Sequence, residues 1–154
     1  MGDLNLTFRS PDIEDMFNLF DQSGREAVMR TLRACGVRDI EETSDAGGGN
    51  KAPDLKAGNV WHEVQVLTQW QGGSEYPYKN PQILGRKADQ PNYCSEGETE
   101  QWWIVSADFS YAMVIPFSAD GVEVECRLRN RPEEGKKKAL RFCAEDCTLV
   151  PLVK

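Results

Sequence analysis

Residues 50–70 read "NKAPDLKAGNVWHEVQVLTQW" and decide how the rest of the chain is interpreted. A Pro-Asp pair opens the stretch, and a Gly-Asn pair separates two short hydrophobic runs. Glycine followed by asparagine is a turn signal between two such runs. The stretch therefore predicts two antiparallel neighbouring strands, over residues 54–58 and 60–68. An acidic residue opens the first strand, Asp54, and another lies within the second, Glu63.

Helical patterns precede this hairpin. Apolar residues recur at helical spacing over residues 11–35, and Gly36 follows them as a helix end. Ser23 followed by Glu26 fits a capping box, which would start a second helix. One continuous helix and two helices are both compatible with the pattern. Next come a possible short strand from residue 37 and a polar, glycine-rich connector over residues 44–50.

Strand patterns dominate after the hairpin. The Gly- and Pro-rich residues 70–100 allow at most one short helix, around 80–88. Two apolar runs, 102–106 and 111–117, flank a turn and predict a second hairpin. Three further elements are expected: an alternating exposed or edge strand over 122–130, a final helix over 133–146, and a last strand or packed tail over 147–153.

The order of these elements is a helix, a central set of strands and a second helix. This order predicts an α/β (α+β) fold with a mixed central sheet flanked by helices. With 154 residues, the chain is expected to be a single domain over 1–154. Within it, a core of about residues 20–117 is followed by a basic segment, residues 126–154.

The composition excludes several classes of protein. The chain has 40% hydrophobic residues, no apolar run long enough to span a membrane, and no secretory signal at its start. Its five cysteines are odd in number and irregularly spaced, which argues against a disulfide framework or a zinc knuckle. We expect reduced, buried thiols in a cytoplasmic protein. The one histidine, His62, is expected to be structural.

The net charge of −7 argues against indiscriminate binding of nucleic acids. The charge is uneven, however. Residues 126–154 carry eight Lys or Arg against four Asp or Glu, a local excess of +4. This basic segment is compatible with a solvated face and equally with contacts to phosphate.

Metal-dependent hydrolysis of a phosphodiester needs a carboxylate pair to hold Mg²⁺ and a group that offsets charge in the transition state. A hairpin can supply all of these. One acid opens the first strand, and a second acid and a lysine lie two residues apart on the next strand. Spacing by two places both side chains on one face, because strand side chains alternate.

Four stretches in this order resemble the PD-(D/E)XK nuclease superfamily, in particular group I intron homing endonucleases of that fold and archaeal Holliday-junction resolvases. They are "SGREAVMRTLRACGV", similar to the first helix; "GGGNKAPD", similar to the loop ending in Pro-Asp; "VWHEVQVLT", similar to the second strand; and "NYCSEGETEQWWIVSADFSYAMVIPF", similar to the strand pair of the homing enzymes. The resemblance implies a restriction-endonuclease-like core. It also implies that Glu26 is the acid carried by the helix and Asp54 the central metal-binding aspartate.

The sequence departs from this family at the lysine, and two registers are possible. In the first, Gln65 replaces the second acid and Leu67 replaces the lysine. In the second, Glu63 is the second acid and Gln65 replaces the lysine. The first is favoured because "QVLT" continues the family's run beyond the motif. Under it a leucine stands where a cation is needed, unless Lys51 or Lys56 supplies the charge.

The resemblance implies a Mg²⁺- or Mn²⁺-dependent DNA endonuclease of the homing or resolvase type, impaired by Leu67. Its metal ligands would be Asp54, Gln65 and Glu26. The alternative is an inactive pseudonuclease that acts as a binding or assembly module. Double-stranded or branched DNA and a homo-oligomer, with exposed Trp102, Trp103 and Phe109 at its interface, are the expected partners. Candidate DNA-binding residues are Lys51, Lys56, Lys79, Arg86 and Lys87, with Tyr76 and Tyr78 beside them.

Overall fold

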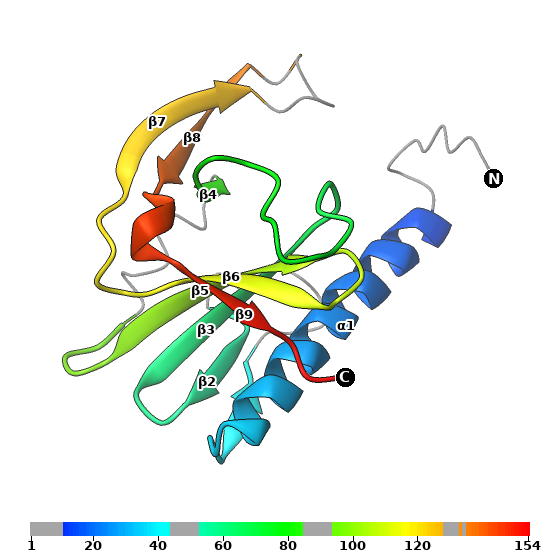
Figure 1. Ribbon diagram of the computed structural model, residues 1–154, viewed down its shortest axis with the longest axis vertical. Helices are drawn as coiled ribbons and strands as arrows, with labels where there is room; N and C mark the ends of the chain where they lie inside the picture. Colours follow the sequence, from blue (N-terminus) through cyan, green and yellow to red (C-terminus); the bar gives the residue numbers. More distant parts are fainter. Residues whose placement is uncertain (1–10, 44–52, 85–93, 128–132, 134) are drawn as a thin grey trace.

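A computed structural model of the chain describes residues 11–43, 53–84, 94–127, 133 and 135–154. One long helix is followed by strands (Figure 1). The elements are α1 (Pro11–Ala34), β1 (Ile40–Glu42), β2 (Leu55–Ala57), β3 (Val60–Leu67), β4 (Gln82–Leu84), β5 (Thr99–Ser106), β6 (Tyr111–Ile115), β7 (Val122–Arg127), β8 (Lys136–Arg141), a 3-10 turn (Ala144–Asp146) and β9 (Thr148–Pro151).

The strands form two sheets. A six-stranded sheet has the order β1-β2-β3-β5-β6-β9, and a three-stranded sheet has the order β4-β8-β7. The pair β3 and β5 is parallel, and the other printed pairs are antiparallel, so the larger sheet is mixed. The predicted hairpin is confirmed, because β2 and β3 are antiparallel neighbours joined at Gly58-Asn59. The coarse α+β class with a mixed sheet is confirmed too.

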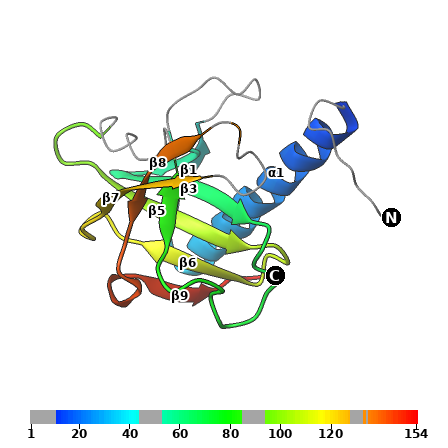
Figure 2. The same cartoon turned by 90° about the horizontal axis from the view of Figure 1, so that it is seen from above.

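Two apolar clusters lie on opposite faces of the larger sheet, because alternate residues of its strands point to opposite sides. On one face, Val28 and Leu32 of α1 pack against Val64 and Trp103. On the other face, side chains of the smaller sheet meet Trp102 and Ile104 of β5, together with Ile83 and Phe142. The molecule thus has three layers, with α1 and the smaller sheet on either side of the larger sheet (Figures 1 and 2).

The first helix is continuous, so the predicted capping box at Ser23 and Glu26 is wrong. Both residues lie in the middle of α1. Gly24 shows what the helix gains from this position. A Cβ atom at Gly24 would lie 2.6 Å from Cγ2 of Val66 and 3.6 Å from Cγ1 of Val64. The glycine therefore lets the helix backbone approach β3 closely, and tertiary packing outweighs its low helix propensity.

We expect Gly24→Ala to destabilise the protein by about 1–2 kcal/mol, although alanine is the better helix former. The added methyl group would push against the branched, stiff side chain of Val66. Chemical denaturation at pH 7 measures the change. Combining Gly24→Ala with Val66→Ala should make the glycine substitution neutral or favourable. If Gly24→Ala alone raises stability, the close approach of α1 and β3 is wrong.

Two predicted helices are wrong. Residues 82–84 of the predicted helix at 80–88 form strand β4, and residues 85–88 lie outside the described residues. The predicted helix over 133–146 is replaced by β8 and the 3-10 turn. "KKKALRF" has helix-forming residues, but Leu140 and Phe142 alternate onto the cluster beneath the smaller sheet. Burial of that alternate pair favours a strand.

The remaining strand predictions are confirmed. Strands β5 and β6 form the second hairpin, β7 lies at an edge of the smaller sheet, and β9 is the last strand. Cys35, Cys94, Cys143 and Cys147 are free, but Cys35 and Cys143 are exposed, so the expectation that all thiols are buried is wrong. In the part of the chain that is described, no helix is long and apolar enough to cross a membrane.

Candidate functional site

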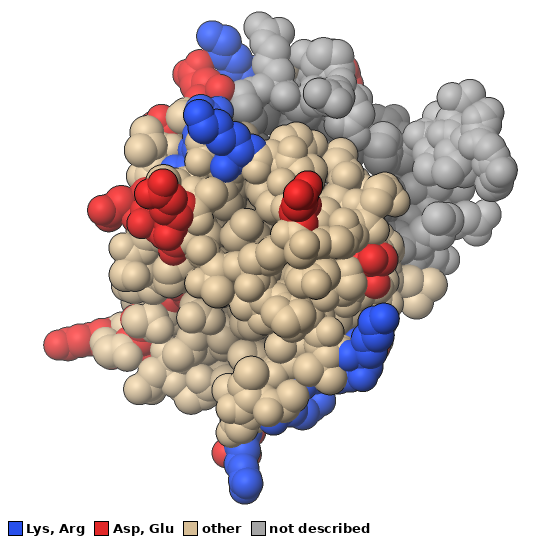
Figure 3. All heavy atoms as spheres, viewed as in Figure 1, with Lys and Arg blue, Asp and Glu red and all other residues tan. Residues whose placement is uncertain are grey.

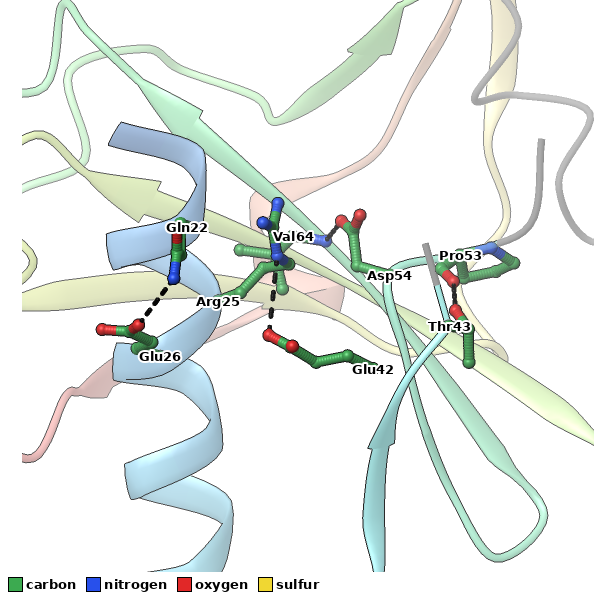
Figure 4. A network of polar contacts seen from close by, with 8 residues as sticks. All are labelled: Gln22, Arg25, Glu26, Glu42, Thr43, Pro53, Asp54 and Val64. Carbon is green, nitrogen blue, oxygen red and sulfur yellow. Dashed lines mark hydrogen bonds and ion pairs between the residues drawn. The ribbon is translucent and has the colours of Figure 1, made fainter. Parts of the chain in front are cut away.

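The β2–β3 hairpin brings Asp54 beside Glu63. Leu55 pairs with His62, so one further step of the same register places Asp54 opposite Glu63. The position of the aspartate is fixed by two hydrogen bonds. Its carboxylate Oδ2 accepts the backbone N–H of Val64 at 2.9 Å (Figure 4). Its carbonyl accepts the N–H of Thr43 at 2.9 Å. The two carboxyl groups therefore come from adjacent strands at the point where β2 begins.

The polar face of β3 contains Glu63 and Gln65. They alternate with Val64, which packs against α1, so both point to the opposite side of the sheet. Glu63 is 5% exposed, and Gln65 is half-buried. A carboxyl group with so little exposure is uncommon in proteins unless other groups stabilise it. This face of β3 thus carries one carboxylate, Glu63, and one amide, Gln65.

Leu67 lies on the same face but has different surroundings. Its side chain packs against the apolar cluster that includes Trp70 and Trp102. A leucine in this place completes the core beneath the smaller sheet. The structure therefore separates the strand face into a polar part at Glu63 and Gln65 and an apolar part that starts at Leu67. Leu67 is thus part of the core, and the polar side chains on this face of β3 are Glu63 and Gln65.

Glu26 does not join Asp54. It is exposed, and its Oε1 accepts a hydrogen bond from Nε2 of Gln22, one turn earlier on α1, at 3.2 Å. Figure 4 shows Glu26 pointing away from Asp54, whereas Arg25 extends toward the middle of β3, where Asp54 lies beside Val64. The expected gathering of Glu26, Asp54 and Gln65 is therefore not what the structure shows. The α1 residue that extends toward Asp54 is therefore a cation, Arg25, and not an acid.

Lys56 is held away from the acid pair. Its Nζ lies 2.8 Å from Oε2 of Glu98 and 4.7 Å from the centre of the Trp61 ring. The other oxygen of Glu98 accepts the Trp61 Nε1–H and the backbone N–H of Ser95. The hydrogen bond from Lys56 and those from Ser95 and Trp61 lower the pKa of Glu98 to about 2. The ion pair between Lys56 and Glu98 thus holds the segment before β5 against the hairpin.

The other predicted DNA-binding residues are distributed as follows. Lys51, Arg86 and Lys87 lie outside the described residues. Lys79 is exposed, and so is Tyr78, whereas Tyr76 packs edge-on against the ring of Trp70. The face of the molecule in Figure 3 is mostly uncharged, with basic side chains near its margins. That face lacks the broad basic surface typical of a protein that binds DNA by charge alone.

The basic C-terminal segment is partly neutralised across the β7–β8 hairpin. Lys136 lies 3.5 Å from Glu125, and Lys138 lies 3.5 Å from Glu123. All four side chains are substantially exposed, so each pair contributes little to stability. These pairs favour the interpretation of this part of the segment as a solvated face.

The surface on which the expectation of an oligomer rested is buried. Trp102 is 4% exposed and Trp103 is 5% exposed, and they pack in the two clusters on opposite faces of the larger sheet. Phe109 is half-buried and meets the ring of Phe20 edge-on. Oligomerisation remains a prediction, but these residues are not a reason for it.

His62 has a structural role, as predicted. It is 3% exposed, and its Nδ1 accepts the Nε1–H of Trp103 at 3.0 Å. Nδ1 therefore carries no proton and the imidazole is neutral. Burial lowers the pKa of His62 from 6.5 to about 4. A neutral, buried ring that accepts an indole N–H fixes the position of β5 against β3.

We expect His62 to make stability depend on pH between 6.5 and 4. The unfolded chain binds a proton in this range and the folded chain does not, so the stability present above pH 6.5 is lost as the pH falls toward 4. The shift corresponds to about 3 kcal/mol. Denaturant unfolding at pH 7 and pH 4.5 measures it.

A His62→Gln variant provides the control, because it cannot titrate and should show a weaker dependence on pH in this window. Glu98 titrates lower, between its usual pKa and about 2, so the two effects separate. Equal pH dependence of the variant and the unsubstituted chain would contradict a neutral buried His62.

Two residues near the site were missed by the sequence analysis. Arg25 was overlooked because Glu26 beside it fitted a motif. Glu100 is fully buried on β5, two residues before Trp102 and therefore on the same face. Its alternation with Trp102 was a usable signal. Over the described ranges, no three His, Cys, Asp or Glu residues gather in a way that could hold a metal ion.

Comparison with known proteins adds no relative. No protein-family model, no curated protein and no solved structure matches this chain.

Proposed function

We propose that the chain is a divalent-metal-dependent DNA endonuclease in which Asp54 and Glu63 form the acid pair and Gln65 occupies the position of the usual lysine. The observation that carries this proposal is the hydrogen bond from the Val64 N–H to the Asp54 carboxylate. It fixes the aspartate next to Glu63, on the adjacent strand. A homing or resolvase type of activity, on double-stranded or branched DNA, rests on the family resemblance alone.

The donor atoms suit Mg²⁺ or Mn²⁺. Two carboxylates and an amide are oxygen donors, which are the ligands that these hard cations prefer. Mg²⁺ keeps several water ligands and commonly uses one or two protein carboxylates, so a third acid such as Glu26 is not required. When bound, the ion would polarise the phosphodiester and offset its developing charge. Asp54 and Glu63 would hold it, and the amide of Gln65 would orient a neighbouring polar group.

The fold supports the proposal in a general way. A mixed sheet with a helix packed on one face, and with the acids on a central hairpin, is compatible with a restriction-endonuclease-like core. The second flanking helix expected over 133–146 is absent, since that segment forms β8. The smaller sheet covers the face that bears Leu67.

A second candidate function is a pseudonuclease that binds DNA or a protein partner without cleaving it. Two observations favour it. Leu67, at the expected lysine position, is an apolar residue packed in the core, and Lys56 forms an ion pair with Glu98. Neither position therefore places a free cation beside the acids. The net charge of −7 also fits a module that does not rely on broad phosphate contacts.

Calorimetric titration with Mg²⁺ and Mn²⁺, followed by cleavage assays on linear and four-way branched DNA, tests the proposed function. A nuclease binds the metal and cleaves DNA only in its presence. Metal binding without cleavage of either substrate favours the pseudonuclease. Absence of both metal binding and cleavage contradicts the proposed function.

A further inference from the structure

Arg25 lies at the border between α1 and β3 in an incompletely satisfied state. It follows Gly24, the residue at which α1 closely approaches Val64 and Val66 of β3. The Arg25 side chain is 22% exposed, and its buried Nε has no hydrogen-bond partner among the described residues. The acid nearest to that nitrogen, Glu42, has its Oε1 3.9 Å away, and its side chain is 50% exposed. The pair with Glu42 is therefore long and solvent-screened.

A guanidinium in this state has unused binding capacity. Arginine carries five N–H donors in a planar fork and stays charged at every physiological pH. Leaving a buried donor without a partner is unfavourable, which suggests that a further acceptor completes the site. Figure 4 shows the side chain extended toward Val64 in the middle of β3, beside the Asp54 carboxylate. An anion at this point would face both a carboxylate-bound cation and the arginine.

The other candidate cations on the described hairpin are already engaged or absent. Lys56 forms a 2.8 Å ion pair with Glu98 and lies over the ring of Trp61. The position that the family resemblance gave to a lysine, Leu67, is part of the core. Arg25 thus differs from Lys56 in having a weak partner and in extending toward Asp54.

We propose that Arg25 binds the phosphodiester group of DNA and supplies a positive charge beside Asp54. The proposal rests on the proposed function, since it places the phosphate beside Asp54. The planar fork of a guanidinium matches two phosphate oxygens and can donate to both at once. Arg25 is then the helix-borne substrate contact of this chain.

Binding of a short DNA duplex, measured by fluorescence anisotropy without added metal over a range of salt concentrations, tests this contact independently of cleavage. Arg25→Gln should weaken affinity about tenfold and reduce the slope of log affinity against log salt by about one. Arg25→Lys keeps the charge and the aliphatic stem, so the slope should be retained while affinity falls because the bidentate fork is lost. The matched control is Arg33→Gln, an exposed arginine in the last turn of the same helix, which should change neither quantity.

The outcomes separate the two proposals. If Arg25→Gln binds DNA with unchanged affinity and slope, or if the unsubstituted chain binds no duplex, the phosphate contact is overturned. If Arg25→Gln is too unstable to assay, unchanged affinity of Arg25→Lys overturns it, and a loss of affinity at unchanged salt slope supports it. Mn²⁺ titration should be unaffected by Arg25→Gln. If Arg25→Gln weakens DNA binding but the chain neither binds metal nor cleaves DNA, the proposed nuclease activity is overturned and the phosphate contact of Arg25 is supported.

Discussion

Asp54→Asn is expected to reduce metal-dependent cleavage of DNA by about 10³-fold, equivalent to roughly 4 kcal/mol of transition-state stabilisation. The asparagine oxygen can still accept the N–H of Val64, so the local structure should persist. What the substitution removes is the negative charge that would hold the metal beside Glu63. Single-turnover cleavage at saturating protein, with Mg²⁺ and then with Mn²⁺, measures the loss. Calorimetry should show weaker metal binding in parallel.

Three further variants show whether that loss comes from the acid pair. Glu63→Gln should cause a loss of similar size, and the double variant should lose little more, because residues that hold one ion act as a unit. Glu145→Gln removes an exposed carboxylate in the 3-10 turn and should cleave like the unsubstituted chain. Full cleavage by Asp54→Asn would show that the acids at the hairpin have no part in the reaction.

Gln65→Lys is expected to raise cleavage by about 10²–10³-fold, the range associated with gaining or losing one transition-state donor. Leu67→Lys is expected to give no such gain and to cost about 1–3 kcal/mol of stability, because it places an ammonium group against the apolar cluster that includes Trp70. The two substitutions differ only in their position along one face of β3. Cleavage rates and denaturant midpoints of the two variants, compared side by side, decide between the registers.

The opposite pattern would restore the first register. Under it, Leu67→Lys raises cleavage and Gln65→Lys abolishes it by removing a metal ligand. If neither substitution raises cleavage while Arg25→Gln reduces it, the missing charge is already supplied from the helix. If no variant cleaves linear or branched DNA, the pseudonuclease interpretation replaces the nuclease.

The hairpin was predictable because its determinants are local. Gly58 and Asn59 set the turn, and the runs on either side alternate in strand fashion. The two registers could not be separated from the strand pattern, because Glu63, Gln65 and Leu67 are spaced by two residues and lie on the same face of the strand. The burial of Leu67 joins residues far apart in the chain, so no local pattern shows it.

The helix illustrates a different limit. The motif pointed to Glu26, but which side of a helix faces a sheet depends on where the helix makes its closest approach. Gly24 lies at that approach, with Arg25 extending toward Asp54 and Glu26 exposed to solvent. In the same way, "KKKAL" has helix-forming residues, and the burial of Leu140 beneath the smaller sheet makes it a strand. Local propensity gave the wrong element where tertiary burial was stronger.

The outer strands of both sheets guard this chain against aggregation. An outer strand presents unpaired N–H and C=O groups to which another molecule can add a strand. Here β1 is three residues long and carries exposed Glu41 and Glu42, β7 carries exposed Glu123 and Glu125, and β9 ends in Pro151, which has no N–H. Charge, brevity and proline each oppose growth of a sheet from one molecule into the next. A homo-oligomer of this chain would therefore be built by packing side-chain surfaces together, and not by continuous β-sheet across subunits.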